Sequence, residues 1–218
     1  MDRESGECME KAKIIYAFGD SIVYGHEYFK KSFVNYVGEQ FDFAVEKFAV
    51  NGATIVNAGY EGGQILRQID KAPKQKPDLI IFDGGTNDAE YIGQGGCGYE
   101  QFEQCFRQTV ETIKNTWQDV PVIYVSAHKM GSRKMEIQEQ LRKTALFICK
   151  EYNVWVADVY KDAPFDTNDR EQKNRYTFDT LDENGFPGKG GSGTHPNLEA
   201  IEKFYVPVVA DTLKKIIK

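Results

Sequence analysis

The sequence is poor in the side chains that build metal centres and nucleic-acid interfaces. Its 218 residues include only four cysteines and three histidines, and the cysteines lack the C-x-x-C spacing of zinc sites. The formal net charge is −6 and no Lys/Arg-rich stripe is visible, which argues against nucleic acid and anionic membranes as partners. We therefore expect neither a metal ion nor another cofactor.

Long apolar runs are also missing, which argues against a transmembrane helix. Residues 1–11 are polar and lack the basic start and apolar stretch of a secretory signal, so we expect a flexible N-terminus and a cytoplasmic protein. Cys149 lies in an apolar helical pattern, which is typical of a free buried thiol. The sequence leaves open whether Cys97 and Cys105 pair.

Short apolar stretches alternate with amphipathic ones along the chain. This alternation predicts parallel strands joined by helices on both faces of the sheet, an α/β fold with three α/β/α layers. No repeat or linker interrupts it, so we expect one domain over residues 1–218 with a substantial core. The expected strands are 14–18, 43–50, 77–83, 121–126 and 154–159, and the expected helices are 28–40, 64–69, 99–117, 133–151 and 198–217.

The first predicted strand ends abruptly at Gly19-Asp20-Ser21. Ser21 thus lies at the carboxyl end of a strand, where open α/β sheets place their ligand crevices. The nearby glycines, Gly19 and Gly25, allow a sharp turn and leave room for a substrate beside the hydroxyl. The alternative is that Ser21 only caps the following helix.

Three further candidate residues lie in turns next to predicted elements. Gly52 follows the second predicted strand, Asn87 follows the third, and His195 precedes the last helix. A serine nucleophile needs a base, most often a histidine, and the oxyanion of acyl transfer needs N–H donors. Together these residues predict acyl transfer at one edge of the sheet, although each alone could serve a turn or a helix start. We expect His26 and His128 at the surface, with the crevice as the alternative.

Four blocks of the sequence resemble those of the SGNH, or GDSL, hydrolase family and follow the family's order: Gly19-Asp20-Ser21, Val50-Asn51-Gly52-Ala53-Thr54, Gly85-Thr86-Asn87-Asp88 and Gly193-Thr194-His195-Pro196-Asn197. The resemblance spans nearly the whole chain. It implies a flavodoxin-like, five-stranded parallel sheet and an esterase or lipase activity. The Gly-x-Ser-x-Gly elbow typical of the α/β-hydrolase fold is absent.

Carried over by position, the resemblance implies that Ser21 is the nucleophile and His195 the general base. The N–H groups of Ser21 and Gly52 and the side chain of Asn87 would form the oxyanion hole. The glycine pair at 62–63 is a weaker candidate than Gly52, because only Gly52 is followed by the Ala-Thr of the family block.

One position departs from the family. Members usually carry an aspartate three residues before the histidine, where this chain has Ser192. In serine proteases, loss of the acid costs on the order of 10⁴ in rate, because the acid fixes the histidine tautomer. The Ser192 hydroxyl, a backbone carbonyl, or Asp179 or Asp182 could orient His195 instead. Otherwise an aspartate was engineered away or the site is inactive; we favour an active Ser–His pair.

The sequence defines the substrate less well. The predicted loops 93–98 and 161–193 would flank the crevice, and the longer loop is polar with few large aliphatics. This composition favours a small-molecule or oligosaccharide ester with a short acyl group, resembling family members that remove O-acetyl groups from carbohydrates, although a solvated loop would look alike. The alternatives are a lysophospholipase- or thioesterase-like hydrolase and a catalytically silent carbohydrate-binding protein, and the oligomeric state stays open. The polar loop residues are Asp166, Asp169, Arg170, Arg175, Tyr176, Asp179 and Asp182.

Overall fold

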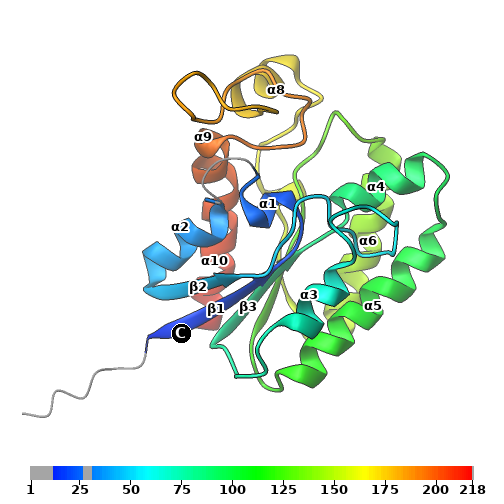
Figure 1. Ribbon diagram of the computed structural model, residues 1–218, viewed down its shortest axis with the longest axis vertical. Helices are drawn as coiled ribbons and strands as arrows, with labels where there is room; N and C mark the ends of the chain where they lie inside the picture. The colour runs from blue at the N-terminus through cyan, green and yellow to red at the C-terminus, as the bar shows by residue number, and fades with distance from the viewer. Residues whose placement is uncertain (1–11, 27–30, 218) are drawn as a thin grey trace, which may run out of the picture.

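A five-stranded, all-parallel sheet lies at the centre of the computed structural model, which describes residues 12–26 and 31–217 (Figure 1). The strand order β2-β1-β3-β4-β5 is flavodoxin-like. Helices cover both faces of the sheet, so the predicted α/β fold with three layers is confirmed. The strands are β1 (Lys13–Phe18), β2 (Phe43–Lys47), β3 (Leu79–Asp83), β4 (Val122–Val125) and β5 (Trp155–Ala157).

Alternate residues of β1, β3 and β4 enter two separate cores, because successive side chains point to opposite faces of the sheet. Tyr16 and Phe18 pack into one core, and Ile15 and Ala17 into the other. Since both faces are covered, the strand sequences are almost continuously apolar. The first core includes residues of α3 (Ile65–Lys71), α5 (Tyr99–Thr116) and α6 (Met135–Glu151), and the second includes residues of α2 (Phe33–Phe41) and α10 (Val206–Ile216), as Figure 1 shows.

The second strand is shorter than its sequence predicts. It ends at Lys47 rather than at residue 50, because its partner β1 ends at the same level. The chain nevertheless stays beside β1. Phe48 donates its N–H to the Ala17 carbonyl at 2.8 Å, and Val50 donates to the Gly19 carbonyl at 3.1 Å. These bonds carry the loop after β2 to the carboxyl end of β1.

Several helices lie where the sequence predicts loops. Helix α4 (Thr86–Gly93) starts directly after the turn at Gly84 and Gly85. The segment 161–193 is only partly irregular. It begins within α7 (Val159–Asp162) and contains α8 (Arg170–Tyr176). A bridge between Leu181 and Pro187 closes a short hairpin in it. Figure 1 shows this segment, in orange, at the end of the sheet where α1 begins.

The predicted terminal helix 198–217 is interrupted by a wider turn. It consists of α9 (Leu198–Ala200), a π-helical turn at Ile201–Tyr205, and α10. Pro207 lies at the start of α10 and has no N–H to continue an α-helical bond pattern. The proline therefore accounts for the change of helix type at this point.

Some expectations fall on residues that the structure does not describe. The flexible N-terminus expected at 1–11, Cys8 and the start of the helix expected at 28–40 lie outside the described residues. Among the helices within 12–26 and 31–217, none has both the length and the apolar character needed to cross a membrane.

Gly19→Ala is expected to destabilise the protein, because an added Cβ at Gly19 (φ +151) would lie 1.8 Å from Oδ1 of Asp83. Overpacking costs about 1–3 kcal/mol, so we expect the free energy of unfolding, measured by urea denaturation, to fall by about 2 kcal/mol or more. Gly98→Ala is the control, since Gly98 has φ −93 and open space around it. Equal losses in the two variants would contradict this prediction.

Candidate active site

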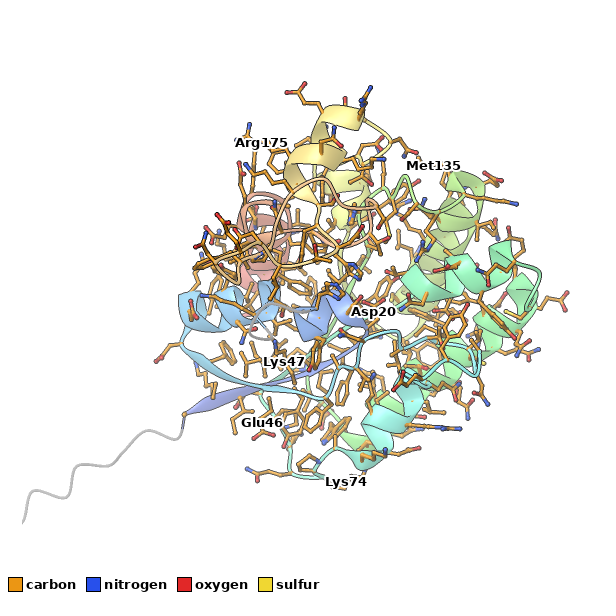
Figure 2. The ribbon with its side chains drawn as sticks, turned by 45° about the horizontal axis from the view of Figure 1, so that its top comes forward. Asp20, Glu46, Lys47, Lys74, Met135 and Arg175 are labelled. Carbon is orange, nitrogen blue, oxygen red and sulfur yellow. The ribbon has the colours of Figure 1, made fainter. Side chains whose placement is uncertain are left out.

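The turn after β1 places Ser21 at the first position of a one-turn helix, α1 (Ser21–Tyr24). Asp20 is the N-cap of this helix, and its Oδ1 accepts from the N–H of Ile22 at 2.9 Å. Ser21 is therefore not the capping residue, which was the alternative considered from the sequence. Figure 2 shows Asp20 beside α1, well inside the molecule, whereas Arg175 lies on α8 near its outer edge.

Two buried side chains bind the backbone of this turn. Gln68 on α3 makes two hydrogen bonds with Gly19: its Oε1 accepts from the N–H at 2.9 Å, and its Nε2 donates to the carbonyl at 2.8 Å. Asp83, the last residue of β3, accepts from the N–H of Asp20 through Oδ1 at 2.9 Å. These bonds satisfy buried backbone groups and so fix the turn. Sequence analysis singled out neither Gln68 nor Asp83.

His195 lies against the serine, although 174 positions separate them in the chain. Its Nε2 is 3.0 Å from Oγ of Ser21. The His195 carbonyl accepts from the N–H of Phe178 at 3.0 Å, which fixes the backbone of the histidine. Burial, and to a smaller extent the charge of His26, lower the pKa of His195 to about 3. The imidazole is therefore neutral at pH 7 and can accept the serine proton.

The loop after β2 and the start of α4 lie beside each other. Gly52 has φ +74, a left-handed conformation that favours glycine. Its neighbour Ala53 accepts a hydrogen bond from Nδ2 of Asn87 at 2.9 Å, which uses one of the two amide hydrogens of that side chain. Gly62 packs against the same loop, since an added Cβ would lie 2.2 Å from the carbonyl oxygen of Asn51. This close packing explains why position 62, in the second glycine pair, holds a glycine.

Three carboxyl groups are buried around this edge of the sheet. Asp88 accepts from the N–H groups of Ile55 and Val56 at 3.0 and 2.9 Å, and burial raises its pKa to about 6. Burial also raises the pKa of Asp20 and Asp83, and for Asp83 the charge of Asp20 adds to the effect. Because two contacting carboxylates repel each other, a proton on Asp83 stabilises the turn.

Ser192, at the position where an acid was expected, binds a carboxylate from elsewhere. Asp179 accepts from the Ser192 N–H through Oδ2 at 2.9 Å and from the Ser192 hydroxyl through Oδ1 at 3.0 Å. Asp182 instead closes its own turn, where Oδ1 accepts from the N–H of Phe186 at 2.9 Å. Among the described residues, Nδ1 of His195 has no hydrogen-bond partner. Neither aspartate therefore takes the usual place of the acid.

The expected surface position of His128 is wrong, whereas the half-buried His26 lines a hollow beside Ser21 and His195, which was the alternative considered from the sequence. The ring of His26 stacks on that of His195, with centroids 3.7 Å apart and planes 8° apart. His128 is completely buried, with Nε2 at 3.0 Å from the Gly193 carbonyl and Nδ1 at 2.8 Å from the hydroxyl of Tyr205. Burial lowers the pKa of His128 to about 4, so it is neutral at pH 7 and serves as a structural support for the loop before His195.

A hollow beside Ser21 and His195 is lined mainly by apolar side chains. The polar loop residues that were expected to flank the crevice largely serve local structure: Asp169 caps α8, Arg175 pairs with Glu199, and Tyr176 is buried. The long loop contributes apolar residues to the hollow instead. The apolar lining residues are Ile22, Phe178, Pro187, Pro196, Leu198 and Ile201.

Three cysteines are free thiols in the structure. Cys149 is buried, as predicted, and Cys97 and Cys105 are unpaired with each other. Within 12–26 and 31–217, no group of three or more histidine, cysteine, aspartate or glutamate side chains is arranged to hold a metal ion.

The chain is similar to known hydrolases. The family model described as GDSL-like Lipase/Acylhydrolase family matches residues 17–200. No curated protein matches the chain. Among solved structures, a protein from Lactobacillus plantarum has a TM-score of 0.69 at 18% identity, over 95% of this chain and 97% of its own.

Two further structures carry family or enzyme names. A member of the lipolytic protein G-D-S-L family from Veillonella parvula has a TM-score of 0.61 at 17% identity, over 94% of this chain and 98% of its own. TesA has a TM-score of 0.65 at 15% identity, over 94% of this chain and 100% of its own. At these identities the structures show a shared fold.

Asp83→Asn is expected to become more stable relative to the wild type as pH rises from 4.5 to 7.5. The pKa of Asp83 is higher in the folded than in the unfolded protein, so proton binding stabilises the fold at low pH and this stability is lost as pH rises through the folded pKa. Asparagine imitates the protonated acid and keeps an oxygen for the Asp20 N–H.

Urea unfolding of both proteins at the two pH values measures this effect. Asp119→Asn is the control, since the side chain of Asp119 is 93% exposed. Parallel pH dependences of wild type and Asp83→Asn would show that Asp83 is ionised in the folded protein.

Proposed function

The chain belongs to the GDSL-like lipase/acylhydrolase family, whose members are carboxylic ester hydrolases, and we propose that Ser21 and His195 perform this hydrolysis on esters with short acyl groups. The observation that carries the proposal is the 3.0 Å distance between Oγ of Ser21 and Nε2 of His195. A serine hydroxyl is a weak nucleophile, and a hydrogen-bonded neutral histidine is the usual means of activating it.

In the proposed first step, Oγ of Ser21 attacks the ester carbonyl while Nε2 of His195 takes the hydroxyl proton. The N–H groups of Ser21 and Gly52 and the side-chain amide of Asn87 donate to the oxygen that becomes negative. Support for this oxyanion hole comes from the bond between Asn87 and Ala53, which holds the amide beside the Gly52 loop.

The acyl-enzyme forms when His195 returns its proton to the leaving alcohol and the bond between carbonyl carbon and alcohol oxygen breaks. Water, deprotonated by the same imidazole, then attacks the acyl group. The bond between the acyl carbon and Oγ of Ser21 breaks, the acid leaves, and His195 returns the proton to Oγ. Every step uses groups of this chain and water. His195 is positively charged twice in the cycle, so the stability of its imidazolium decides the rate.

Asp179 supplies the negative charge that an acid at position 192 would otherwise supply. The carboxylate is held by two hydrogen bonds from Ser192, three residues before His195. Its charge raises the pKa of His195 against the larger effect of burial. In this proposal Asp179 stabilises the imidazolium through space, without a hydrogen bond to Nδ1.

For the substrate, we propose an O-acetyl or similarly short acyl ester, with a carbohydrate as the alcohol part. The exposed polar side chains of the segment 161–193, which lie outside the hollow, support a polar carrier. The apolar lining of the hollow beside Ser21 supports a short acyl group. The same apolar lining favours the second candidate, an acyl hydrolase of lysophospholipase or thioesterase type. Acyl-chain length distinguishes the two.

Ser21→Ala and His195→Ala are each expected to lower kcat/KM for p-nitrophenyl acetate by at least about 10³-fold, because the two side chains act as a unit. Circular dichroism checks the fold, and Thr112→Val, which removes a hydroxyl from the outer helix α5, is the control with unchanged activity. If Ser21→Ala retained the wild-type rate, the proposed nucleophile would be wrong. A wild type without esterase activity would favour the silent binding protein.

The acyl-length preference follows from the same assay with p-nitrophenyl butyrate and octanoate and with acetylated xylo-oligosaccharides. The highest kcat/KM on acetyl esters, with acetate released from the oligosaccharides, supports the carbohydrate esterase. The highest kcat/KM on octanoate supports the lysophospholipase- or thioesterase-like hydrolase instead.

Asp179→Asn is expected to lower kcat about tenfold with little change in KM, because the imidazolium loses a nearby negative charge. Asn keeps an oxygen for one of the two hydrogen bonds that Ser192 donates to Asp179. Asp182→Asn is the matched control, since Asp182 lies on the same loop and binds only its own turn. An Asp179→Asn variant with wild-type kcat at pH 7.5 would contradict a role for this carboxylate.

A further inference from the structure

His26 and His195 form a closely stacked pair at the edge of the hollow. Their ring centroids are 3.7 Å apart and their planes differ by 8°. Phe178 contacts the same rings from the side, with its centroid 5.4 Å from that of His26 and 6.4 Å from that of His195. The base therefore has an aromatic ring on one face and an aromatic edge beside it.

The backbone turn that begins at Ser21 places His26 beside His195. Helix α1 ends at Gly25, which has the left-handed φ of +91, and the carbonyl of Ser21 accepts from the N–H of both Gly25 and His26 at 3.0 Å. His26 has φ +34, a conformation that non-glycine residues adopt at a cost. The turn thus ties His26 to Ser21 through the backbone and to His195 through the ring.

The base lacks the partner that usually fixes its plane. In a triad the acid accepts from Nδ1 and so prevents the ring from tilting. Here Nδ1 of His195 is buried without a partner in the described part of the chain, and Ser192 binds Asp179 instead. The hydrogen bond to Ser21 fixes only one point of the ring, whereas a parallel ring at 3.7 Å restrains its whole plane.

We propose that His26 is a positioning residue for His195, whose stacked ring holds the imidazole in the plane in which Nε2 faces the Ser21 hydroxyl. This inference rests on the proposed function, because it assigns His26 a role only if Ser21 and His195 react. The turn that carries Ser21 then also carries His26, which restrains the base. His26 thereby orients the ring of His195, as the acid of a triad would.

Several charged groups act on the base in addition to burial, which is the main cause of its low pKa. The carboxylate of Asp179 raises the pKa of His195. Lys31 lines the same hollow. His26 also lowers the pKa of His195, as do two residues of the connection between β4 and α6, Arg133 and His128. Replacing His26 by a neutral ring therefore keeps the stack and removes one of these charges.

The test compares His26→Ala with His26→Phe. We expect His26→Ala to lower kcat for p-nitrophenyl acetate about tenfold at pH 8 with little change in KM, and His26→Phe to restore kcat to within about threefold of wild type, because phenylalanine keeps the stacked face. In His26→Phe the pKa of His195, followed by NMR titration of its ring protons, should move up. This shift reports the loss of the His26 charge, whereas the recovery of kcat at an unchanged KM reports the stacked ring.

Labelling by a fluorophosphonate gives a readout independent of ester binding. Oγ of Ser21 displaces fluoride from phosphorus and His195 takes the proton, so the labelling rate reports how well the base is oriented. We expect the rate to fall in His26→Ala and to recover in His26→Phe. Wild-type labelling and kcat in His26→Ala, with Ser21→Ala inactive, would overturn the inference and leave the proposed function intact.

A different pattern would also be decisive. If His26→Phe were as slow as His26→Ala while both kept the thermal stability of the wild type, stacking would not be the property that matters, and the inference would fail. If Ser21→Ala were as active as the wild type, the proposed function would fail first.

Discussion

The peptide groups at the end of β1 are buried, and the hydrogen bonds that they need determine the geometry of the site. Gln68 supplies both a donor and an acceptor to Gly19, and Asp83 accepts from Asp20. Both side chains come from neighbouring elements that already pack against β1. A rotation of the turn would break these bonds, and each buried peptide group left unpaired costs about 1–3 kcal/mol. Ser21 therefore has one orientation at the edge of the sheet.

The histidine side of the site is fixed by a separate set of bonds. His128, neutral because it is buried, binds the Gly193 carbonyl, and Asn197 caps α9 on the far side of His195. A backbone bridge between Thr177 and Pro196 closes the same segment. The base is thus supported from both directions along the chain. Its backbone does not depend on an acid at position 192, although its ring does need a substitute restraint.

The sequence predicted the parts of this arrangement that follow from chain order. Ser21, Gly52 and Asn87 each come directly after a predicted strand, and parallel strands place their carboxyl ends at one edge. Apolar runs likewise predicted the five strands and the three layers. The position of His26 was not predictable in this way, because it depends on a left-handed turn after Gly25 and on contact with a residue far along the chain.

When the acid of a triad is substituted, its functions need not pass to a single residue at the same place. An acid beside a histidine does two things: it fixes the ring and it stabilises the positive charge. In the mechanism that we propose, the two tasks lie with different elements. The stacked ring of His26 would restrain the plane, and the carboxylate of Asp179 raises the pKa of His195 against the larger effect of burial.

Separating the tasks changes how the imidazolium is stabilised. With Nδ1 unpaired, the charged form is unfavourable until negative charge develops on the substrate carbonyl. In the proposed mechanism, the oxyanion itself then compensates the charge on His195. Stabilisation that arises only when the transition state forms raises kcat rather than binding alone. A weakly basic histidine is therefore compatible with hydrolysis, provided that its ring is already held toward Ser21 before the reaction begins.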